Sequence, residues 1–368
     1  MNVRALLAKN YINFRGWSTK RKIVIIESDD WGSVRIANAE VAGKLANKFP
    51  EGKKSPFLEY DGLERKEDLE LLLDVLDKYK DVKGNSPVIT ALSLTSNPDF
   101  ELIDRTGEYH SETIEKTYQN YGENELFQFW ITEGIKKNLL FPQFHGKEHL
   151  FPERYFSRIQ DENDTEHFAF INKSILGSNN SVARNKNFLA AFEYHNDRDK
   201  MNIEIRTEEG LNKFEELFGF RSVSFCPSQS IYGDHIFKIL KDNGVLAIQA
   251  GQQFVPHNMT LKKVDHLWGD KTSNGIVFWR RNCTFEPSKS KKPDFVNECL
   301  KEIEIAFRWG KPAVINSHRV NYTSRVKSDV RDITLANLDN MLKIILKKWP
   351  DVEFLNSADL AKLMHVGN

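Results

Sequence analysis

Cysteine is scarce in this sequence. The 368 residues include only three cysteines, Cys226, Cys283 and Cys299, and no two of them form a C-x-x-C pair. Cysteines scattered in this way give neither a disulfide framework nor a cysteine-ligated zinc site. We therefore expect a protein of a reducing compartment.

Net charge and long apolar runs are missing as well. Lys+Arg and Asp+Glu each number 52, so the formal net charge is zero and nothing global indicates nucleic acid or an anionic membrane as a partner. No segment approaches the roughly 20 apolar residues of a membrane-spanning helix. The N-terminal MNVRALLAKNYINFRGW lacks the apolar stretch of a signal peptide. The expectation is a soluble, cytoplasmic protein without a membrane span. The aromatic residues, 25 Phe, 10 Tyr and 7 Trp, suit either a sugar-binding cleft or simply the core.

Short apolar segments alternate with amphipathic ones along the whole chain. Eight segments are predicted to form buried strands: 22–28, 87–94, 139–144, 222–226, 245–249, 275–280, 312–317 and 352–355. Five are predicted to form helices: 67–79, 124–138, 235–243, 295–309 and 334–349. This alternation predicts an α/β fold with a mostly parallel sheet, closed into one distorted or incomplete (β/α) barrel over residues 1–368.

Three polar stretches interrupt the alternation. Residues 150–215 contain few apolar runs and are predicted to form an insertion within the barrel domain, or a lid over the barrel mouth. Residues 48–66 and 97–120 are predicted to form long loops.

Two adjacent carboxylates, Asp29 and Asp30, follow the first predicted strand in KIVIIESDDWGS. Barrel enzymes carry their chemistry at the carboxyl ends of strands, where these residues are expected. Neighbouring strand side chains point to opposite faces, but both can reach one cleft where the chain turns. Two close carboxylates repel, and a metal ligand beside a general base is one stable arrangement. The alternative is a loop whose Asp caps the next helix.

A pair of histidines follows another predicted strand in PQFHGKEHL, residues 142–150. His145 and His149 share a face on a helical turn, which suits two imidazoles on one divalent ion. The alternative is a surface turn with two unrelated histidines. The segment also fits the H-x-x-E-H pattern of inverzincin peptidases, with Glu148 as base. We rank that hypothesis lower, because those enzymes carry the pattern on a helix.

Two further strand ends complete the set. PAVINSHRVNY, residues 312–322, ends a strand at His318, which is either a general acid or a histidine satisfied by backbone contacts. SVSFCPSQSIYG, residues 222–233, is predicted to form a cleft wall. The strand ends together offer two His and one Asp for a metal, one Asp as base and one His as acid.

These motifs, in this order, resemble those of the polysaccharide deacetylase superfamily (NodB homology, carbohydrate esterase family 4). E-S-D-D-W-G resembles the family's T-F-D-D-G, and still more the A-D-D-F-G of YdjC-type sugar deacetylases. H-G-K-E-H resembles H-[ST]-x-x-H, S-F-C-P-S resembles the R-x-P turn, and N-S-H-R resembles L-x-H. E-F-L-N-S-A-D-L, residues 353–360, resembles the closing F-x-T-L-x-E-L.

The resemblance implies a distorted (β/α)7 barrel of the glycoside hydrolase and deacetylase kind. It implies that Asp29 is the catalytic base and His318 the general acid. Asp30, His145 and His149 would bind one divalent ion, zinc foremost, with cobalt, nickel or manganese as alternatives. The implied activity is removal of acetyl groups from an N-acetylated sugar or polysaccharide, with a carbohydrate as partner and no nucleic acid.

The sequence also departs from the family pattern. Trp31 separates Asp30 from Gly32, and Phe225 and Cys226 stand where the family has the arginine that orients the base. Arg280 or Arg281 is a candidate to replace that arginine. The substrate contacts we predict are Trp31, Pro227, Tyr232, Arg280 and Arg319.

Two other functions stay open on the sequence. A non-catalytic carbohydrate-binding relative would keep the barrel, and the missing arginine favours it. A glycosidase would need two carboxylates across the scissile bond, and Glu27 shares a strand with Asp29.

Overall fold

A parallel sheet forms the centre of the protein. The computed structural model describes residues 3–49, 55–177, 187–257, 260–289 and 294–366. Every strand pair in this sheet is parallel. The strand order is β10 (Val277–Phe278), β7 (Ala247–Ile248), β6 (Ser224–Phe225), β5 (Leu140–Gly146), β2 (Ile89–Leu94), β1 (Lys22–Trp31), β12 (Ala313–His318) and β11 (Cys283–Thr284), with β13 (Val352–Phe354) paired to the start of β1. All eight predicted strands are present.

The two ends of this sheet approach each other. β10 and β11 stand at opposite ends of the strand order, yet only residues 279–282 connect them. Because each residue spans at most about 3.6 Å, the sheet has to curve round until its ends are near. The fold is therefore an incomplete barrel of parallel strands, which confirms the predicted fold class.

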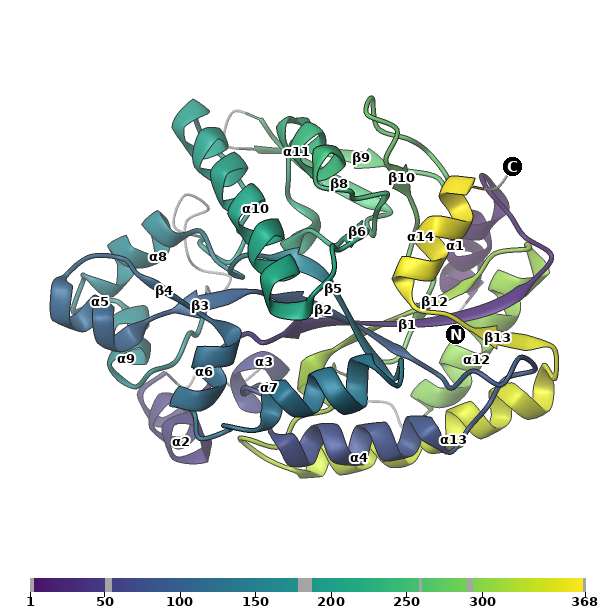
Figure 1. Cartoon of the computed structure of the whole chain (residues 1–368), viewed down its shortest axis with the longest axis horizontal. Coiled ribbons are helices and arrows are strands. Elements are labelled where there is room, and N and C mark those ends of the chain that lie inside the picture. The colour runs from purple at the N-terminus through teal and green to yellow at the C-terminus, as the bar shows by residue number, and fades with distance from the viewer. Residues whose placement is uncertain (1–2, 50–54, 178–186, 258–259, 290–293, 367–368) are drawn as a thin grey trace.

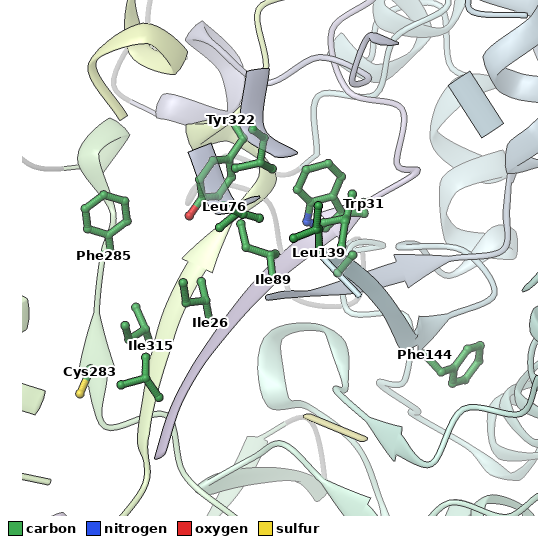
Figure 2. Close-up of a cluster of buried hydrophobic side chains, with 14 of the residues drawn as sticks. Ile26, Trp31, Leu76, Ile89, Leu139, Phe144, Cys283, Phe285, Ile315 and Tyr322 are labelled. Carbon is green, nitrogen blue, oxygen red and sulfur yellow. The ribbon is translucent and has the colours of Figure 1, made fainter. Parts of the chain in front are cut away.

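Helices cover the outside of the sheet (Figure 1). The principal ones are α4 (Lys66–Asp77), α10 (Asp197–Phe218), α11 (Phe237–Asp242), α12 (Phe295–Arg308) and α13 (Asp329–Lys348). In Figure 1, α4 and α13 run together below the sheet, whereas α10 and α11 lie above it. Figure 2 shows strand residues such as Ile26 and Ile89 packed beside Leu76 of α4 in the main core. This burial of apolar surface between helices and sheet is the principal stabilising contribution to the fold.

Successive residues of β1 belong to two different cores. Val24 and Ile26 pack in the large core under the helices. Ile23 and Ile25 pack in a smaller core inside the barrel, together with Trp279. This alternation follows from the two-residue period of a strand. The odd-numbered residues of β1 therefore point into the barrel, which decides where Glu27 and Asp29 lie.

The region predicted as an insertion contains a principal helix. Residues 150–215 include α8 (Pro152–Ile159), α9 (Thr165–Ile171) and most of α10, and residues 178–186 lie outside the described part. Phe214 of α10 packs edge-on against Phe144 of β5, with ring centroids 6.3 Å apart. α10 thus covers the sheet, and the predicted insertion over residues 150–215 includes most of a helix that packs on the barrel. Its apolar residues recur at three- and four-residue spacing, but Gly210 and many charged residues obscured the pattern.

The two predicted loops also contain regular structure. Residues 97–120 form α5 (Phe100–Thr106), α6 (Ile114–Asn120) and the small sheet of β3 (Ser96–Pro98) and β4 (Ser111–Thr113). Residues 48–66 include α3 (Pro56–Glu59), and residues 50–54 lie outside the described part. The predicted helix 124–138 is divided into α7 (Leu126–Phe129) and a π-helix, Trp130–Ile135.

The remaining elements lie at the periphery. They are α1 (Val3–Phe14), α2 (Ala39–Lys48), α14 (Ser357–Val366), the hairpin of β8 (Gln252–His257) and β9 (Thr260–Asp265), and 3-10 turns at Ser228–Ser230, Asp234–Ile236, Pro287–Lys289 and Arg319–Asn321. Among the helices of the described ranges, none is both long and apolar enough to pass through a bilayer.

Candidate active site

The carboxyl ends of β1, β5 and β12 open into one cavity. It has a volume of about 710 Å³ and is lined by the five side chains predicted as base, acid and metal ligands. These are Asp29, Asp30, His145, His149 and His318. Three segments that lie far apart in the sequence thus meet at a single site.

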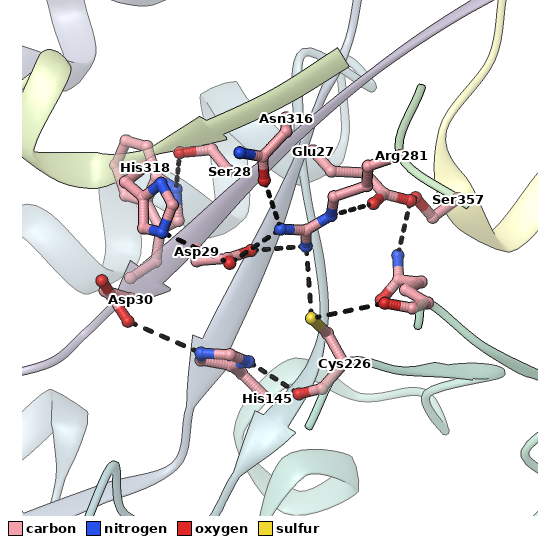
Figure 3. A network of polar contacts seen from close by, with 12 residues as sticks. Glu27, Ser28, Asp29, Asp30, His145, Cys226, Arg281, Asn316, His318 and Ser357 are labelled. Atoms are coloured by element: carbon pink, nitrogen blue, oxygen red, sulfur yellow. Dashed lines mark hydrogen bonds and ion pairs between the residues drawn. The ribbon is translucent and has the colours of Figure 1, made fainter. Parts of the chain in front are cut away.

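A bulge at the end of β1 directs both carboxylates into this cavity. The pairing of β1 with β2 shifts register between Ser28 and Trp31. Asp30 has φ of +75°, in the left-handed region that aspartate tolerates better than most residues. By strict alternation Asp30 would point outwards, towards the helices. The bulge reverses its direction, so that Asp29 and Asp30 face the same space (Figure 3).

The same bulge places Trp31 in the core. Its side chain is fully buried, lies against Trp130 and Tyr322, and donates a hydrogen bond from Nε1 to the Ser28 hydroxyl at 2.9 Å. Trp31 is not among the residues that line the cavity. The predicted contact between Trp31 and substrate is therefore wrong, because the turned Asp30 moves the next side chain to the helix side of the sheet.

Asp30, His145 and His149 form a compact group with the geometry of a metal site. The Asp30 Oδ1 atom lies 3.2 Å from His149 Nε2 and 3.5 Å from His145 Nε2. One ligand atom from each of the three residues falls within 4.8 Å of the others. Two imidazoles and one carboxylate form the protein ligand set of many hydrolytic zinc sites, which leave a position open for water or substrate.

The hydrogen bonds of His145 support this interpretation. Its Nδ1 donates to the Cys226 carbonyl at 2.7 Å, which leaves the lone pair on Nε2. That Nε2 is buried and accepts no hydrogen bond from any residue that the structure describes. A buried polar atom without a partner is unfavourable, and a divalent cation would satisfy it. The residues present therefore fit a bound metal ion.

The protonation of this group is set by opposing effects. Burial raises the pKa of Asp30, but His149 and His145 lower it. The pKa of Asp30 ends well below its ordinary value, so its carboxylate is ionised. Burial lowers the pKa of His149 to about 4, which leaves a neutral imidazole at pH 7. Burial lowers the pKa of His145, but the contact with Asp30 raises it. The pKa of His145 ends well above its ordinary value. A proton on His145 therefore competes with a cation, and metal affinity should fall in acid.

Arg281 fixes the carboxylate of Asp29. It donates two hydrogen bonds to the two carboxylate oxygens, at 2.6 and 2.8 Å, in the bidentate geometry typical of the guanidinium group. Burial raises the pKa of Asp29, but the charges of Arg281 and then of His318 lower it to about 2. Asp29 is thus held ionised in one orientation, and the arginine contact comes from the connection between β10 and β11. Arg281, not Arg280, occupies this position.

Glu27 holds Arg281 in turn. It is fully buried and accepts a hydrogen bond from Arg281 Nε at 2.7 Å. It also accepts hydrogen bonds from Gln249, Trp279 and Ser357 at 2.8 to 3.0 Å. A carboxylate saturated in this way is unavailable as one of the two carboxylates of a glycosidase. From the sequence alone, we predicted no role for Glu27 beyond that alternative.

His318 stands on the other side of Asp29. The His318 Nε2 atom lies 3.7 Å from Asp29 Oδ2, and its Nδ1 is hydrogen-bonded to Glu286. Asn321 donates to Glu286 at 2.7 Å and so orients it. Burial lowers the pKa of His318, but the negative charge of Glu286 raises it. The pKa of His318 ends above its ordinary value. Glu286 was not predicted as a site residue, because β11, the strand before it, has only two residues and was not recognised in the sequence.

Arg319 points away from the cavity, into the protein. It follows the alternation of β12 and lies fully buried against Asp61 at 2.7 Å and Glu64 at 3.0 Å. It also donates to the Ser33 carbonyl, while Glu64 accepts from the Gly32 amide at 2.8 Å. The predicted contact of Arg319 with substrate is therefore wrong. Arg319 instead stabilises the turn that follows Asp30.

We expect that replacing Arg319 with methionine lowers the free energy of unfolding by about 3–5 kcal/mol, because the buried Asp61 and Glu64 lose the cation that is hydrogen-bonded to both, and Asp61 keeps the more distant Arg35 at 3.9 Å. Urea unfolding followed by circular dichroism measures this. Arg308→Met is the control, since the exposed Arg308 at the end of α12 should change stability by less than about 0.5 kcal/mol. Equal effects of the two substitutions would contradict the role given to Arg319.

The other predicted residues divide into two groups. Pro227 and Arg280 line the cavity, so they remain predicted substrate contacts. Tyr232 is fully buried and packs against Phe237, which makes it part of the core rather than of the cavity surface. Glu148 does not line the cavity either, and His145 lies on a strand, so the inverzincin alternative is wrong.

Comparisons with known proteins add a likeness of fold. No protein-family model matches the chain, and no curated protein does. A solved Mycobacterium smegmatis protein assigned as a polysaccharide deacetylase is similar over 95% of this chain and 92% of its own, with 13% identity and a TM-score of 0.42. PuuE allantoinase is similar over 96% of this chain and 93% of its own, with 10% identity and a TM-score of 0.46.

A larger protein shows a similar likeness. The chain spans only 40% of a 4-alpha-glucanotransferase from Thermococcus litoralis, which in turn covers 93% of this chain at 10% identity and a TM-score of 0.45. At such identities the likeness concerns the fold alone.

Proposed function

We propose that the protein is a metal-dependent hydrolase that removes the acetyl group from an N-acetylated sugar or polysaccharide intermediate. The observation that carries this proposal is the placement of the arginine-bound Asp29 in one cavity with the Asp30–His145–His149 group. The order of the sequence motifs, from S-D-D-W-G to N-S-H-R, supports it further. The closer resemblance to YdjC-type deacetylases remains a prediction.

Each side chain of the cavity has a step in amide hydrolysis. A divalent ion held by Asp30, His145 and His149, zinc foremost and otherwise cobalt, nickel or manganese, would polarise the acyl carbonyl and acidify a water molecule. Asp29, ionised at all but very acidic pH, accepts a proton from the attacking water. His318, kept protonated by Glu286, donates a proton to the nitrogen as the C–N bond breaks.

The low pKa of Asp29 has a consequence for turnover. A carboxylate with a pKa of about 2 binds its proton only weakly. After the amine has left, His318 lies 3.7 Å away as the nearby acceptor for that proton. Return of the proton from Asp29 to His318 restores both groups, and the products are acetate and a free amine. The pair thus forms a short proton relay across the cavity.

The cavity suits a saccharide. Its volume of about 710 Å³ is within the usual range for small-molecule sites. Gln252, Ser230 and Arg280 line it beside apolar groups such as Phe57. The hydroxyl groups of a sugar would find hydrogen-bond partners among the polar side chains, and the apolar face of the sugar ring would find an aromatic surface. This lining supports a carbohydrate substrate over a purely apolar amide.

The alternative of a non-catalytic carbohydrate-binding relative loses its principal support. It rested on the absence of the arginine that orients the base, and Arg281 contacts Asp29 in its place. Incubating the zinc-loaded protein with N-acetylglucosamine oligomers, N-acetylated sugar nucleotides and their O-acetylated counterparts tests the proposal by enzymatic measurement of acetate. Release of acetate from an N-acetylated member is expected. Saccharide binding without acetate release from the fully loaded protein would favour the non-catalytic alternative.

The pH dependence of turnover is expected to change when Glu286 is replaced by glutamine. The carboxylate of Glu286 raises the pKa of His318, so His318 stays protonated as a general acid to higher pH. Activity is lost as pH rises through that pKa, and without the negative charge this loss should occur at lower pH. Acetate release measured across pH 5 to about 10 gives the profile.

Glu112→Gln provides the control for this experiment. Glu112 is a partly buried carboxylate outside the cavity, so its replacement should leave the profile unchanged. A merely structural role of Glu286 would lower activity equally at every pH, and that result would contradict the assignment of His318 as the acid.

A further inference from the structure

The first helix, α1, is attached to the protein through its polar face. Lys9 forms an ion pair with Glu302 at 2.9 Å and donates to the Asn282 carbonyl at 2.9 Å. Asn13 is fully buried and accepts a hydrogen bond from the Asn282 side chain at 2.8 Å. Asn10 accepts from Trp309 at 2.9 Å. A surface helix ordinarily places its apolar side chains against the protein and its polar ones in solvent. In α1 polar side chains instead make most of the hydrogen bonds and ion pairs to the protein, while Phe14 also packs edge-on against Trp309 with ring centroids 5.0 Å apart.

The outward face of α1 is correspondingly apolar. Leu7, Tyr11 and Phe14 are 65%, 72% and 60% exposed, and their spacing of four and three residues places them on one side of the helix. Leu6 is 42% exposed as well, but it precedes Lys9 by three residues and Asn13 by seven, so it lies on the side of α1 that faces the protein. These are four of the ten exposed large hydrophobic residues in the described part of the chain, gathered on a single helix. Such a concentration on the surface indicates a binding face rather than scattered exposure.

The charges around this face all have one sign. Arg4, Arg15 and Lys20 are exposed, and Arg4 lies on the same side of α1 as Leu7 and Tyr11. Residues 1–26 contain no aspartate or glutamate, although the whole chain carries equal numbers of basic and acidic residues. An apolar helix face whose own exposed charges, and those of the segment that follows it, are all cationic is complementary to a surface that presents acyl chains below anionic headgroups.

We propose that α1 docks in the interface of an anionic phospholipid bilayer, with Leu7, Tyr11 and Phe14 among the acyl chains and Arg4 and Arg15 at the lipid phosphates. A second copy of the chain fits this face less well, because a symmetric pairing of two α1 helices would bring like charges together. The helix is too short to cross the bilayer and would lie along its surface.

The position of α1 relates this surface to the cavity. Ile12, on the same helix, lines the cavity that holds Asp29 and Asp30. Docking of α1 would therefore bring the cavity mouth close to the membrane surface. On the condition that the proposed function holds, the substrate class would be an N-acetylated saccharide carried at a membrane, for example on a lipid.

Vesicle binding tests the docking of α1 independently of activity. The chain of residues 1–368 is sedimented with vesicles of phosphatidylcholine alone or mixed with phosphatidylglycerol. We expect binding to the mixed vesicles that high salt weakens, and a loss of about tenfold or more in affinity for the variant Leu7→Gln/Tyr11→Gln/Phe14→Gln. The matched control Ile171→Gln/Ile205→Gln/Ile333→Gln alters residues that are 58%, 49% and 55% exposed elsewhere, and should bind as the wild type does.

Three outcomes would overturn the proposal. One is equal sedimentation with both kinds of vesicle, and another is equal affinity of the α1 variant and the control variant. The third is a dimer in analytical ultracentrifugation that the α1 variant converts to a monomer without any vesicle binding, which would assign the face to a second copy. An unchanged thermal midpoint and zinc content of both variants establishes that folding and the metal site are intact. Failure of vesicle binding leaves the deacetylase proposal standing, because acetate release from a water-soluble substrate is measured separately.

Discussion

His145→Ala is expected to abolish stoichiometric metal binding. The substitution removes one of three protein ligands, and affinity should fall by more than about 100-fold, since loss of a mere supporting contact already costs 10–100-fold. Elemental mass spectrometry of protein equilibrated with zinc and then desalted measures the number of zinc ions per chain. About one ion per chain is expected for the wild type and close to none for His145→Ala, with the same loss for Asp30→Ala and His149→Ala.

Metal binding by these variants can also be measured through their thermal stability. An ion that binds only the native state stabilises it by RT ln(1 + [L]/Kd), where [L] is the free-ion concentration, so a chelator should lower the thermal midpoint of the wild type. The midpoint of His145→Ala should not respond to the chelator. His365→Ala is the control, because His365 is exposed near the C-terminus and does not line the cavity. Full zinc content in all three ligand variants would show that this group does not hold the ion.

Asp29→Asn is expected to retain the metal ion and lose turnover. Asparagine is similar in size and can still contact Arg281, but it cannot accept the proton of the attacking water. The loss of a general base corresponds to a fall in kcat of about 10²–10⁴-fold. Arg281 keeps Glu27 as its counter-charge in this variant, so we expect little change in folding. Acetate release and zinc content, measured on the same preparation, separate the two effects.

Glu148→Gln is the matched control for Asp29→Asn. Glu148 is buried and lies next to a metal ligand in the sequence, but it contacts Tyr109 rather than the cavity. Its substitution should leave kcat within about threefold of the wild type. Full activity of Asp29→Asn together with inactivity of Glu148→Gln would reverse the assignment of the base.

Strand positions could be predicted from the sequence because buried parallel strands form short apolar runs. The run Ile23 to Ile26 is an example, and each of its side chains is buried in one of the two cores. Helix α10 could not be recognised in the same way, since glycine at position 210 and a charged outer face weakened its pattern. Gly210 has a physical reason: a Cβ there would lie 2.8 Å from the Phe144 ring.

The meeting of Asp30 with His145 and His149 could be predicted because strand ends of a parallel barrel meet at one edge, and the binding of a metal ion by this group remains a prediction. Side-chain direction was harder to predict. The positive φ of Asp30 shifts the alternation by one residue, which the pattern of apolar and polar residues does not reveal. Trp31 was misplaced for that reason. Arg281 was one of two candidates for its position, and the structure decides between them, whereas Glu286 was recognised only where the structure brings it to His318.

The gap between β10 and β11 explains how Arg281 reaches Asp29. A barrel closed by continuous backbone pairing would place a hydrogen-bonded strand there, with little freedom for its side chains. Here residues 279–282 instead connect the two ends of the sheet, with the Trp279 and Asn282 amides bonded to β7 and β12, and Arg281 reaches the interior from that connection. The orientation of Asp29 therefore depends on a side chain supplied at the one place where neighbouring strands of the barrel, over the residues that the structure describes, do not pair with each other.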